Sequence, residues 1–255
     1  MITVNRRKKN FLTLETAYYP EDYTKYSSDA DIVLFYFSSR PVSGAREFNT
    51  LQIDLTKSED QLMNELHKST RHDIVKIQKE GRVTIRLNES PTETDLAEYC
   101  RNYDIFAEMK SIKGSDLSLL KQFAEQKALE LKTAYDADGN ILSSLCNLHT
   151  GHTVLGFYAY SNFRLYEDKD MRRFTANANK YLYWQDILTA KAQGYKILDM
   201  GGLGLGREGA GMDHVDEFKQ GFGGSIVTLY QFYHPLTYRG KIAVNLLKLN
   251  RRIEF

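Results

Sequence analysis

The segment that most constrains the fold lies in the last third of the chain. Residues 176–193 have the spacing of an amphipathic helix and are followed by Gly194. A short strand-like stretch at 195–200 comes next, and it runs into two glycines, Gly201 and Gly202. A buried strand that ends in a glycine loop leaves backbone N–H groups free to meet a ligand. This order of elements predicts a functional site at the end of the strand.

A lysine lies between two phenylalanines shortly downstream, in the segment Phe218-Lys219-Gln220-Gly221-Phe222. A cation close to free backbone N–H groups can face the negative charge that develops in a transition state. We therefore interpret Lys219, with its neighbour Phe218, as a catalytic candidate. The alternative interpretation is a solvated lysine on a short helix.

These segments resemble the C-terminal half of the Fem-type (FemABX) aminoacyltransferases, which are relatives of the GNAT acyltransferases. In that family a helix of the form W-x-x-I-x-x-A-x-x-x-G runs into a strand that ends D-x-G-G, and F-K-x-x-F-G follows. All three pieces occur here in order, beginning at Trp184, at Asp199 and at Phe218. The aromatic stretch Tyr158-Ala159-Tyr160-Ser161 is similar to a strand that precedes the helix in the family. The resemblance covers roughly residues 62–233.

The resemblance implies an N-acyltransferase that moves an aminoacyl group from aminoacyl-tRNA to an amine of a cell-wall (peptidoglycan) precursor. A small metabolite or an amino sugar is an equally open acceptor, and no cofactor is implied. The matching lysine is thought to stabilise the oxyanion and to meet the terminal phosphate of the tRNA. The glycine-bearing loop at 201–213 would close over the site. We include Trp184, Asp199, Gly201 and Gly202 among the substrate-binding candidates, and Asp199 can also anchor the loop by accepting backbone N–H groups.

Hydrophobic periodicity predicts an α/β fold with a mixed sheet, of GNAT type. The predicted strands are 31–37, 48–55, 82–87, 131–137, 141–148, 153–161, 195–200 and 225–233, and the predicted helices are 59–80, 95–106, 115–130, 176–193 and 241–255. We place a domain boundary near residue 90, in a polar turn-forming stretch. Residues 1–90 would form an abbreviated second GNAT-like subdomain, residues 91–240 the acyltransferase domain, and residues 241–255 a helix that rejoins the N-terminal part.

The general base is not identified by spacing. His214 and Asp216 precede Lys219 and are the candidates to accept the amine proton. The stretch from Gly204 to Gly209 satisfies G-x-G-x-x-G, but it lacks the long helix and the acidic residue of a dinucleotide-binding unit. We interpret it as part of the loop.

Two further groups are candidates for substrate binding. The region 62–82 is basic, and Arg71 and Lys76 could meet a phosphate or the tRNA backbone. The tyrosines Tyr158 and Tyr160 could line an acceptor groove, although strand tyrosines are more often packing residues.

The alternative is an acyl-CoA-dependent N-acyltransferase of GNAT type that acts on an envelope polysaccharide precursor. The glycine motif that cradles the pyrophosphate of coenzyme A is, however, missing before residue 176. Arg172 and Arg173 could still bind the phosphates of coenzyme A. A third interpretation of the chain is a catalytically silent acyltransferase fold that serves as a binding module.

Composition limits the classes of protein to which the chain could belong. A chain of 255 residues with 42% hydrophobic content can bury a sizeable core, and a net charge of +1 neither supports nor excludes nucleic acid. Two cysteines form no disulfide framework and no zinc pattern. We expect a cytoplasmic protein, in which a basic amphipathic helix at 241–255 could make peripheral membrane contact.

Overall fold

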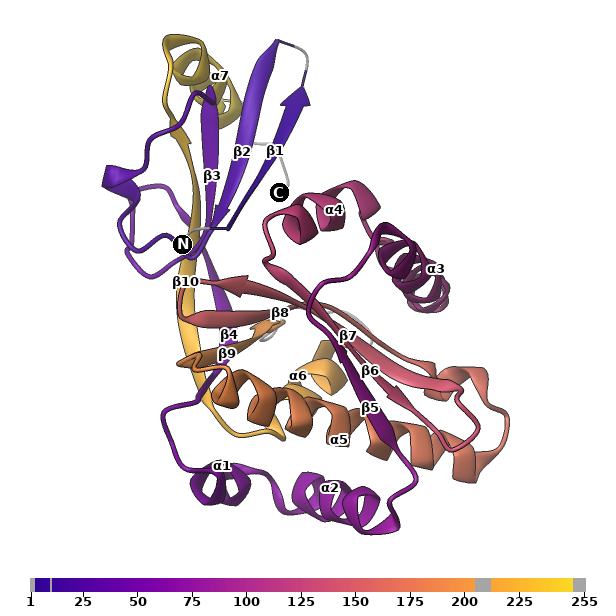
Figure 1. The fold of residues 1–255 in the computed structure, drawn as a ribbon. Coiled ribbons are helices and arrows are strands. Elements are labelled where there is room, and N and C mark those ends of the chain that lie inside the picture. The colour runs from indigo at the N-terminus through magenta and orange to yellow at the C-terminus, as the bar shows by residue number, and fades with distance from the viewer. Residues whose placement is uncertain (1–2, 10, 205–211, 250–255) are drawn as a thin grey trace. The chain divides into compact units, whose positions relative to one another are not determined.

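The chain divides into two compact units (Figure 1). The computed structural model describes residues 3–9, 11–204 and 212–249. The smaller unit comprises residues 1–49 and 228–255, and the larger unit comprises residues 50–227. The chain passes from one unit to the other inside two strands, β4 (Arg46–Asp54) and β10 (Ser225–Pro235). Each unit is described by itself below.

The smaller unit is built on four strands in the order β1-β2-β3-β10. The strands before β10 are β1 (Thr3–Lys9), β2 (Leu12–Tyr18) and β3 (Ile32–Ser38). Strands β2 and β3 are parallel, and the short 3-10 helix η1 (Tyr23–Lys25) lies in their connection, whereas the other neighbours are antiparallel. The core of this unit is formed by Ala17, Val33, Phe35 and Phe232.

Helix α7 (Tyr238–Leu249) closes the smaller unit on the side of β3. Gly240 allows a very close approach, because a Cβ atom built there would lie 2.0 Å from the backbone oxygen of Asp31. Three apolar residues remain on the outer side of the helix, namely Tyr238, Ile242 and Leu246, with exposures of 78%, 47% and 56%. Across the described residues, none of the helices combines the length and the apolar character needed to cross a bilayer.

The larger unit contains a mixed sheet in the order β4-β9-β8-β7-β6-β5. Its further strands are β5 (Thr84–Asn88), β6 (Leu129–Tyr135), β7 (Ile141–Thr150), β8 (Thr153–Ser161) and β9 (Ile197–Gly202). Strands β8 and β9 are parallel, and the other neighbours pair in antiparallel fashion. The predicted meander at 131–161 and the strand at 195–200 are therefore confirmed.

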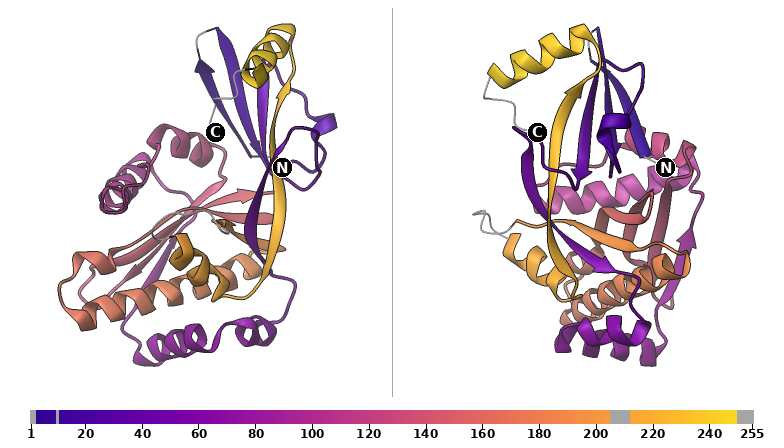
Figure 2. Two further views of the ribbon diagram at one scale, coloured as in Figure 1. Left: turned by 180° about the vertical axis from the view of Figure 1, so that it is seen from behind. Right: turned by 90° about the vertical axis from the view of Figure 1, so that its left-hand side faces the viewer.

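Helices cover both faces of this sheet (Figure 2). The chain forms α1 (Glu59–Glu65), α2 (Lys68–Glu80), α3 (Glu93–Lys110), α4 (Leu117–Glu125), the 3-10 helix η2 (Asn162–Leu165), α5 (Lys169–Ala192) and α6 (Met212–Gln220). One face carries α3 and α4, and the other carries α5, with α1 and α2 outside it. The 24-residue helix α5 connects the two parallel strands, as a crossover connection requires.

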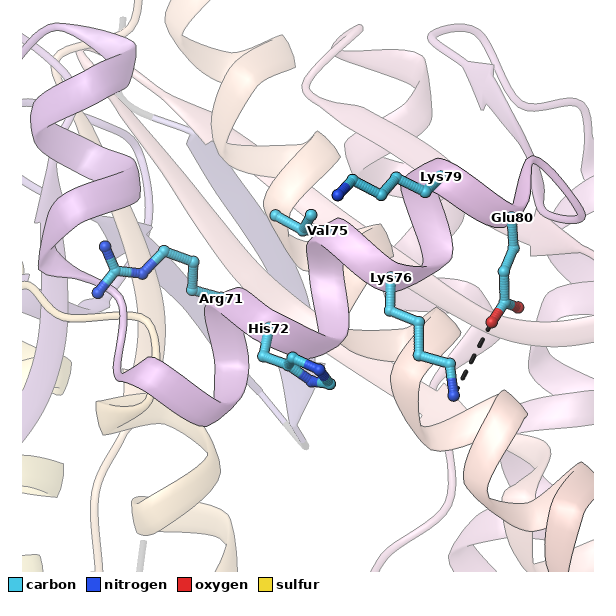
Figure 3. Close-up of a pocket in the computed structure, with 6 residues that line it drawn as sticks. All are labelled: Arg71, His72, Val75, Lys76, Lys79 and Glu80. Atoms are coloured by element: carbon cyan, nitrogen blue, oxygen red, sulfur yellow. Dashed lines mark ion pairs between the residues drawn. The ribbon is translucent and has the colours of Figure 1, made fainter.

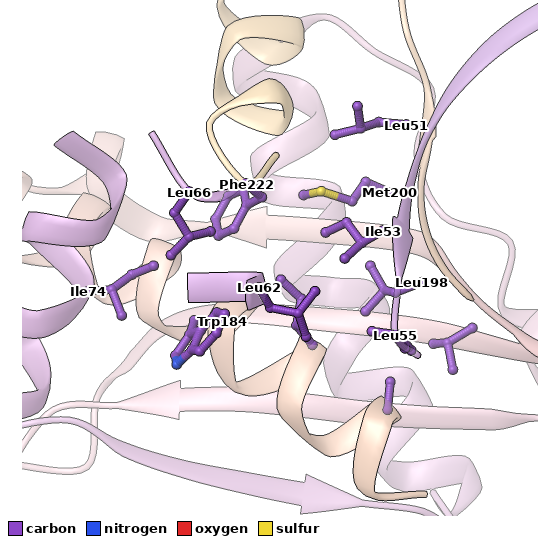
Figure 4. Packing of buried hydrophobic residues seen from close by; sticks show 13 residues of the cluster. Leu51, Ile53, Leu55, Leu62, Leu66, Ile74, Trp184, Leu198, Met200 and Phe222 are labelled. Atoms are coloured by element: carbon purple, nitrogen blue, oxygen red, sulfur yellow. The ribbon is translucent and has the colours of Figure 1, made fainter. Parts of the chain in front are cut away.

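The main core of the larger unit lies between α5 and the sheet (Figure 4). Trp184 and Ile187 of α5 pack there against Leu198 and Met200 of β9 and against Phe222, which follows α6. Leu62 and Ile74 extend this core to α1 and α2. Each of these side chains is less than 6% exposed, so the core holds the helix, the strand and the segment after α6 in fixed relative positions.

Several predicted boundaries differ from those observed. The single helix predicted at 59–80 is two helices, because Leu66 and His67 adopt extended backbone with ψ of 140° and 144°. The helix predicted at 176–193 begins earlier, at Lys169, where Asp168 caps it by accepting the Met171 N–H. The boundary predicted near residue 90 falls between β5 and α3, inside the larger unit. The strands β1 and β2 were not predicted.

Gly224 offers a test of the fold of the larger unit. Its φ is +81°, and a Cβ atom there would lie 2.5 Å from the Gln52 oxygen. We expect Gly224→Ala to lower the free energy of unfolding by about 3 kcal/mol or more, since backbone strain adds to a backbone clash. Urea denaturation measures this. The matched control is Gly139→Ala, where φ is +86° but the space is open, and the cost should stay near 1 kcal/mol. Equal losses in both variants would contradict the clash.

Candidate active site

The parallel strands β8 and β9 separate near the middle of the sheet. Their pairing comprises Thr153–Ile197, Val154–Leu198 and Leu155–Asp199. Just beyond, the register between β7 and β8 shifts at Phe157. Residues 153–155 and 160–161 are buried, whereas 156–159 are all half-buried. Because successive strand residues face opposite sides, both sides of β8 are partly accessible there. We call residues 156–159 together with Gly201 and Gly202 the strand opening.

Asp199 fixes the backbone on one side of the strand opening. Its carboxylate is fully buried and accepts the Gly201 N–H at 2.7 Å. It also accepts the Gln52 side-chain amide at 2.9 Å and the Thr50 hydroxyl, both from β4. These contacts hold Gly201 at a φ of +80°, which glycine adopts without strain. Asp199 therefore anchors the glycine turn that the sequence predicted to be a site.

Lys219 lies at the strand opening. It occupies the last turn of α6, and its Nζ donates a hydrogen bond to the Gly202 oxygen at 2.6 Å. A Cβ atom built on Gly201 would lie 3.7 Å from this Nζ and 3.4 Å from the Gly156 oxygen. The side chain is half-buried, and its contacts with Gly201 and Gly202 place the ammonium at the end of β9.

Two effects act on the pKa of Lys219 in opposite directions. Burial lowers the pKa of Lys219 below its ordinary value, and the charges of Asp199 and Asp216 act in the opposite direction. An ammonium has three N–H groups, and the Gly202 carbonyl accepts from one of them. The site can therefore present a partly desolvated cation to an oxyanion.

The residues around Lys219 hold its helix end in place. Phe218 and Phe222 contact each other and Tyr183 of α5, with ring centroids 5.2–5.5 Å apart. The Gly221 oxygen accepts the His67 N–H at 3.0 Å, at the start of α2. A Cβ atom on Gly221 would lie 2.7 Å from the Thr70 hydroxyl, so only glycine fits. The structure thus places Phe218 as a packing partner that positions Lys219.

The other predicted catalytic residues are spread along α6. Asp216 is 7% exposed and accepts the Gly204 N–H at 3.0 Å, which anchors the start of the predicted loop. His214 is exposed and lies 3.5 Å from Glu217, so it faces away from the core. Residues 205–211 of the predicted loop lie outside the described residues. Trp184, a predicted substrate-binding residue, is buried in the core with 4% exposure.

The two predicted groove tyrosines face α3. Tyr158 packs on Tyr103 at 4.7 Å, and Tyr160 packs on Tyr99 at 5.4 Å between ring centroids. Burial raises the pKa of Tyr158 to about 12. Ala159, between the two tyrosines, packs against the core on the α5 side. The tyrosines therefore lie on the face of the sheet opposite α5.

The predicted phosphate-binding residues lie along the outer side of α2 (Figure 3). Arg71 and Lys76 line a cavity of about 470 Å³ together with His72, Val75, Lys79 and Glu80. Lys76 lies 3.8 Å from Glu80, and Arg71 donates to the Asn64 side chain at 3.3 Å. Helix α2 therefore carries a basic surface. The start of the same helix contacts Gly221 through the His67 N–H.

A buried polar network beneath the sheet was not predicted. Lys132 donates to Asp186 at 2.6 Å and lies 3.4 Å from Glu130, and Asn147 donates to both carboxylates. Each of the four residues is at most 2% exposed. Burial raises the pKa of Asp186. Burial acts in the same direction on Glu130, but other interactions outweigh it. A hydrogen bond with His149 and the charge of Lys132 instead lower the pKa of Glu130 to about 2.

No sequence-family model and no curated protein matches this chain. Solved structures match in fold. The crystal structure of FemX gives a TM-score of 0.67 at 12% identity, over 95% of this chain and 85% of FemX. L-PGS from Bacillus licheniformis gives 0.53 at 15% identity, over 98% and 86%. The C-terminal domain of a putative lysylphosphatidylglycerol synthetase from Agrobacterium fabrum gives 0.54 at 11%, over 92% and 82%. The predicted fold class is confirmed: the chain has the Fem-like, GNAT-type acyltransferase fold.

Proposed function

We propose that the protein is an N-acyltransferase whose reaction takes place at the strand opening. The observation that carries this proposal is the Lys219 ammonium, which lies next to Gly201 and donates to the Gly202 oxygen at the strand opening. An amine nitrogen attacks the ester carbonyl of the donor, and a C–N bond forms as the carbonyl oxygen takes the negative charge. Lys219 stabilises that oxyanion. The C–O bond to the carrier then breaks, the carrier hydroxyl takes up a proton, and the nitrogen loses one.

We propose aminoacyl-tRNA as the donor. The basic surface of α2, with Arg71 and Lys76, suits a polyanionic carrier. The first turn of α2 contacts Gly221, two residues after Lys219, so a carrier bound along the helix would lie next to the reacting centre. The fold shared with FemX is consistent with this donor. The acceptor is an amine of a cell-wall precursor, an amino sugar or a small metabolite.

The start of α5 does not favour an acyl-CoA donor. A pyrophosphate binds at a helix N-terminus through free N–H groups and the helix dipole. Here Asp168 accepts the Met171 N–H at 2.7 Å, and Asp170 adds a second negative charge to the first turn. Arg172, a candidate for phosphate binding, donates to the Tyr166 oxygen at 2.6 Å. Two carboxylates at this position would repel a phosphate.

Neither candidate base is well placed to take the amine proton. Asp216 is engaged with the Gly204 N–H, and His214 is exposed beside Glu217. We therefore propose that transfer depends on positioning of the two substrates and on oxyanion stabilisation. The amine proton would leave through solvent.

The experiment that tests the proposal is a donor competition. Purified protein is mixed with a pool of charged tRNA or a pool of acyl-CoA, together with candidate amines, and new amides are detected by mass spectrometry. We expect amide formation with charged tRNA that is abolished by prior deacylation of the tRNA. If only acyl-CoA is consumed, the donor is acyl-CoA and the proposal of aminoacyl-tRNA is wrong. Consumption of neither donor would support a binding module and overturn the proposal.

A further inference from the structure

Helix α7 of the smaller unit carries an apolar stripe on its exposed side. Tyr238, Ile242 and Leu246 recur every four residues, so they lie along one side of the helix. All three are exposed, whereas Val244, which points to the other side, is 4% exposed. An amphipathic surface helix normally turns its apolar side to the protein core, but here a second apolar side is left in solvent. Such a stripe marks an interaction surface.

Cations lie on both flanks of this stripe. With 3.6 residues in a turn, Arg239 follows the stripe on one flank and Lys241 on the other, and both side chains are exposed. The sequence of α7 contains no acidic residue. The acid that contacts its first turn is Asp31, which is buried, accepts the Thr237 hydroxyl at 2.6 Å and lies 3.7 Å from Arg239. Lys241 forms no ion pair within the described residues.

The turn between β1 and β2 lies at the same end of the smaller unit as α7 (Figure 1, Figure 2). Ile32, the first residue of β3, pairs with Leu14 near the start of β2 and with Pro235 at the end of β10. The turn before β2 and the helix after β10 therefore leave the sheet at one end. Phe11 lies in that turn and is 74% exposed. A second apolar side chain is thus exposed at the end that carries the stripe.

Positive charge is in excess in this unit, although the whole chain has a net charge of only +1. The smaller unit includes twelve Lys and Arg residues but seven Asp and Glu residues. Two of these acids, Glu15 and Asp29, both pair with Arg6. Arg7 and Lys8, which lie closer to the β1–β2 turn, are exposed. Exposed apolar side chains and an excess of cations therefore occur together at one end.

We propose that α7 binds the surface of an anionic lipid bilayer. Tyr238, Ile242 and Leu246 enter the boundary between the head groups and the acyl chains, and Arg239 and Lys241 meet the lipid phosphates. A second copy of the chain would match the stripe but would bring a second set of the same cations to the interface, which like-charge repulsion disfavours. The proposal goes beyond acyl transfer and does not depend on it, since binding is measured without any donor.

The test is flotation of the whole protein with lipid vesicles. One set of vesicles contains phosphatidylcholine alone, and in the other set one lipid in three is phosphatidylglycerol. We expect binding to the anionic vesicles, at least tenfold weaker binding to phosphatidylcholine alone, and weakening of the anionic binding as sodium chloride is added.

Single variants of α7 separate the apolar contribution from the charge contribution. Ile242→Gln should weaken binding to the anionic vesicles about fivefold, because a half-exposed apolar side chain is lost. Lys241→Gln should also weaken it about fivefold, the effect of one cation near the surface. Both positions are exposed, so the melting temperature should stay unchanged.

The matched controls lie in the larger unit. Ile226 is 49% exposed, against 47% for Ile242, and Lys113 is exposed as Lys241 is. Ile226→Gln and Lys113→Gln should bind the anionic vesicles as the wild type does.

Three vesicle results would overturn the proposal: no binding to either set, equally tight binding to phosphatidylcholine alone, or a loss in Ile242→Gln no larger than in Ile226→Gln. Analytical ultracentrifugation tests the second copy. A wild-type dimer that Ile242→Gln converts to a monomer would assign the stripe to a partner chain and would also overturn the proposal. Failure of amide formation would leave all these outcomes unaffected, so the two hypotheses are tested separately.

Discussion

Lys219→Met should lower kcat/KM for amide formation by about 100- to 1000-fold, the range found when one oxyanion donor is removed. The long apolar side chain of methionine fills similar space, and removing a half-buried ammonium should leave the free energy of unfolding unchanged or slightly higher. Rates are measured with the donor identified in the competition experiment, and stability is measured by urea denaturation. A variant that retains more than half of the wild-type rate would contradict the role of Lys219.

The pH dependence of the reaction provides an independent check on Lys219. Burial lowers the pKa of this lysine, so its proton is lost at a lower pH than that of a free lysine. The rate should therefore fall as pH rises through that lowered pKa, because the neutral amine cannot stabilise an oxyanion as a cation does. Lys219→Arg keeps its charge at all accessible pH values and should lose this descending limb. An unchanged profile would indicate that another group titrates.

Lys132→Met should lower the free energy of unfolding by about 3–5 kcal/mol. The substitution leaves the carboxylates of Glu130 and Asp186 buried together without the cation that lies 3.4 Å and 2.6 Å from them. Chemical denaturation at neutral pH measures the loss.

Two further variants show whether buried charge is the cause. In the double variant Lys132→Met/Asp186→Leu one carboxylate is removed along with the cation, and the loss should be smaller than in Lys132→Met alone. Lys121→Met breaks an ion pair with the exposed Glu93 and should cost less than about 1 kcal/mol. A loss in Lys121→Met as large as that in Lys132→Met would contradict the explanation.

The sequence predicted the central elements because their signals are local. The strand at 153–161 matches β8 at both ends, and the strand at 225–233 matches most of β10. Strand β1 was missed because its Arg6-Arg7-Lys8 run is polar, although Asn5 within it is 3% exposed. The break at Leu66 was missed because apolar residues continue across it at helical spacing, into Ile74 of the next helix.

The candidate site was predictable in part. Gly201 and Lys219 could be singled out from spacing, but their contact depends on how α6 packs against α5 through Phe218 and Phe222. The buried network was invisible because Glu130 and Lys132 alternate with leucines, as solvent-facing strand residues do. Only the position of α5 over that face reveals that both charges are enclosed. The partners of Asp199 on β4 were equally inaccessible, since 147 and 149 residues separate them in the chain.

The hydrogen bonds from β4 to Asp199 matter for any attempt to study the protein in pieces. A fragment that starts near residue 90 would retain Lys219, Asp199 and both glycines of the turn. It would lack Thr50 and Gln52, and the carboxylate would then have lost two of the donors that hold it. We expect such a fragment to carry every residue of the family-like motif and still to lack contacts that fix the glycine turn.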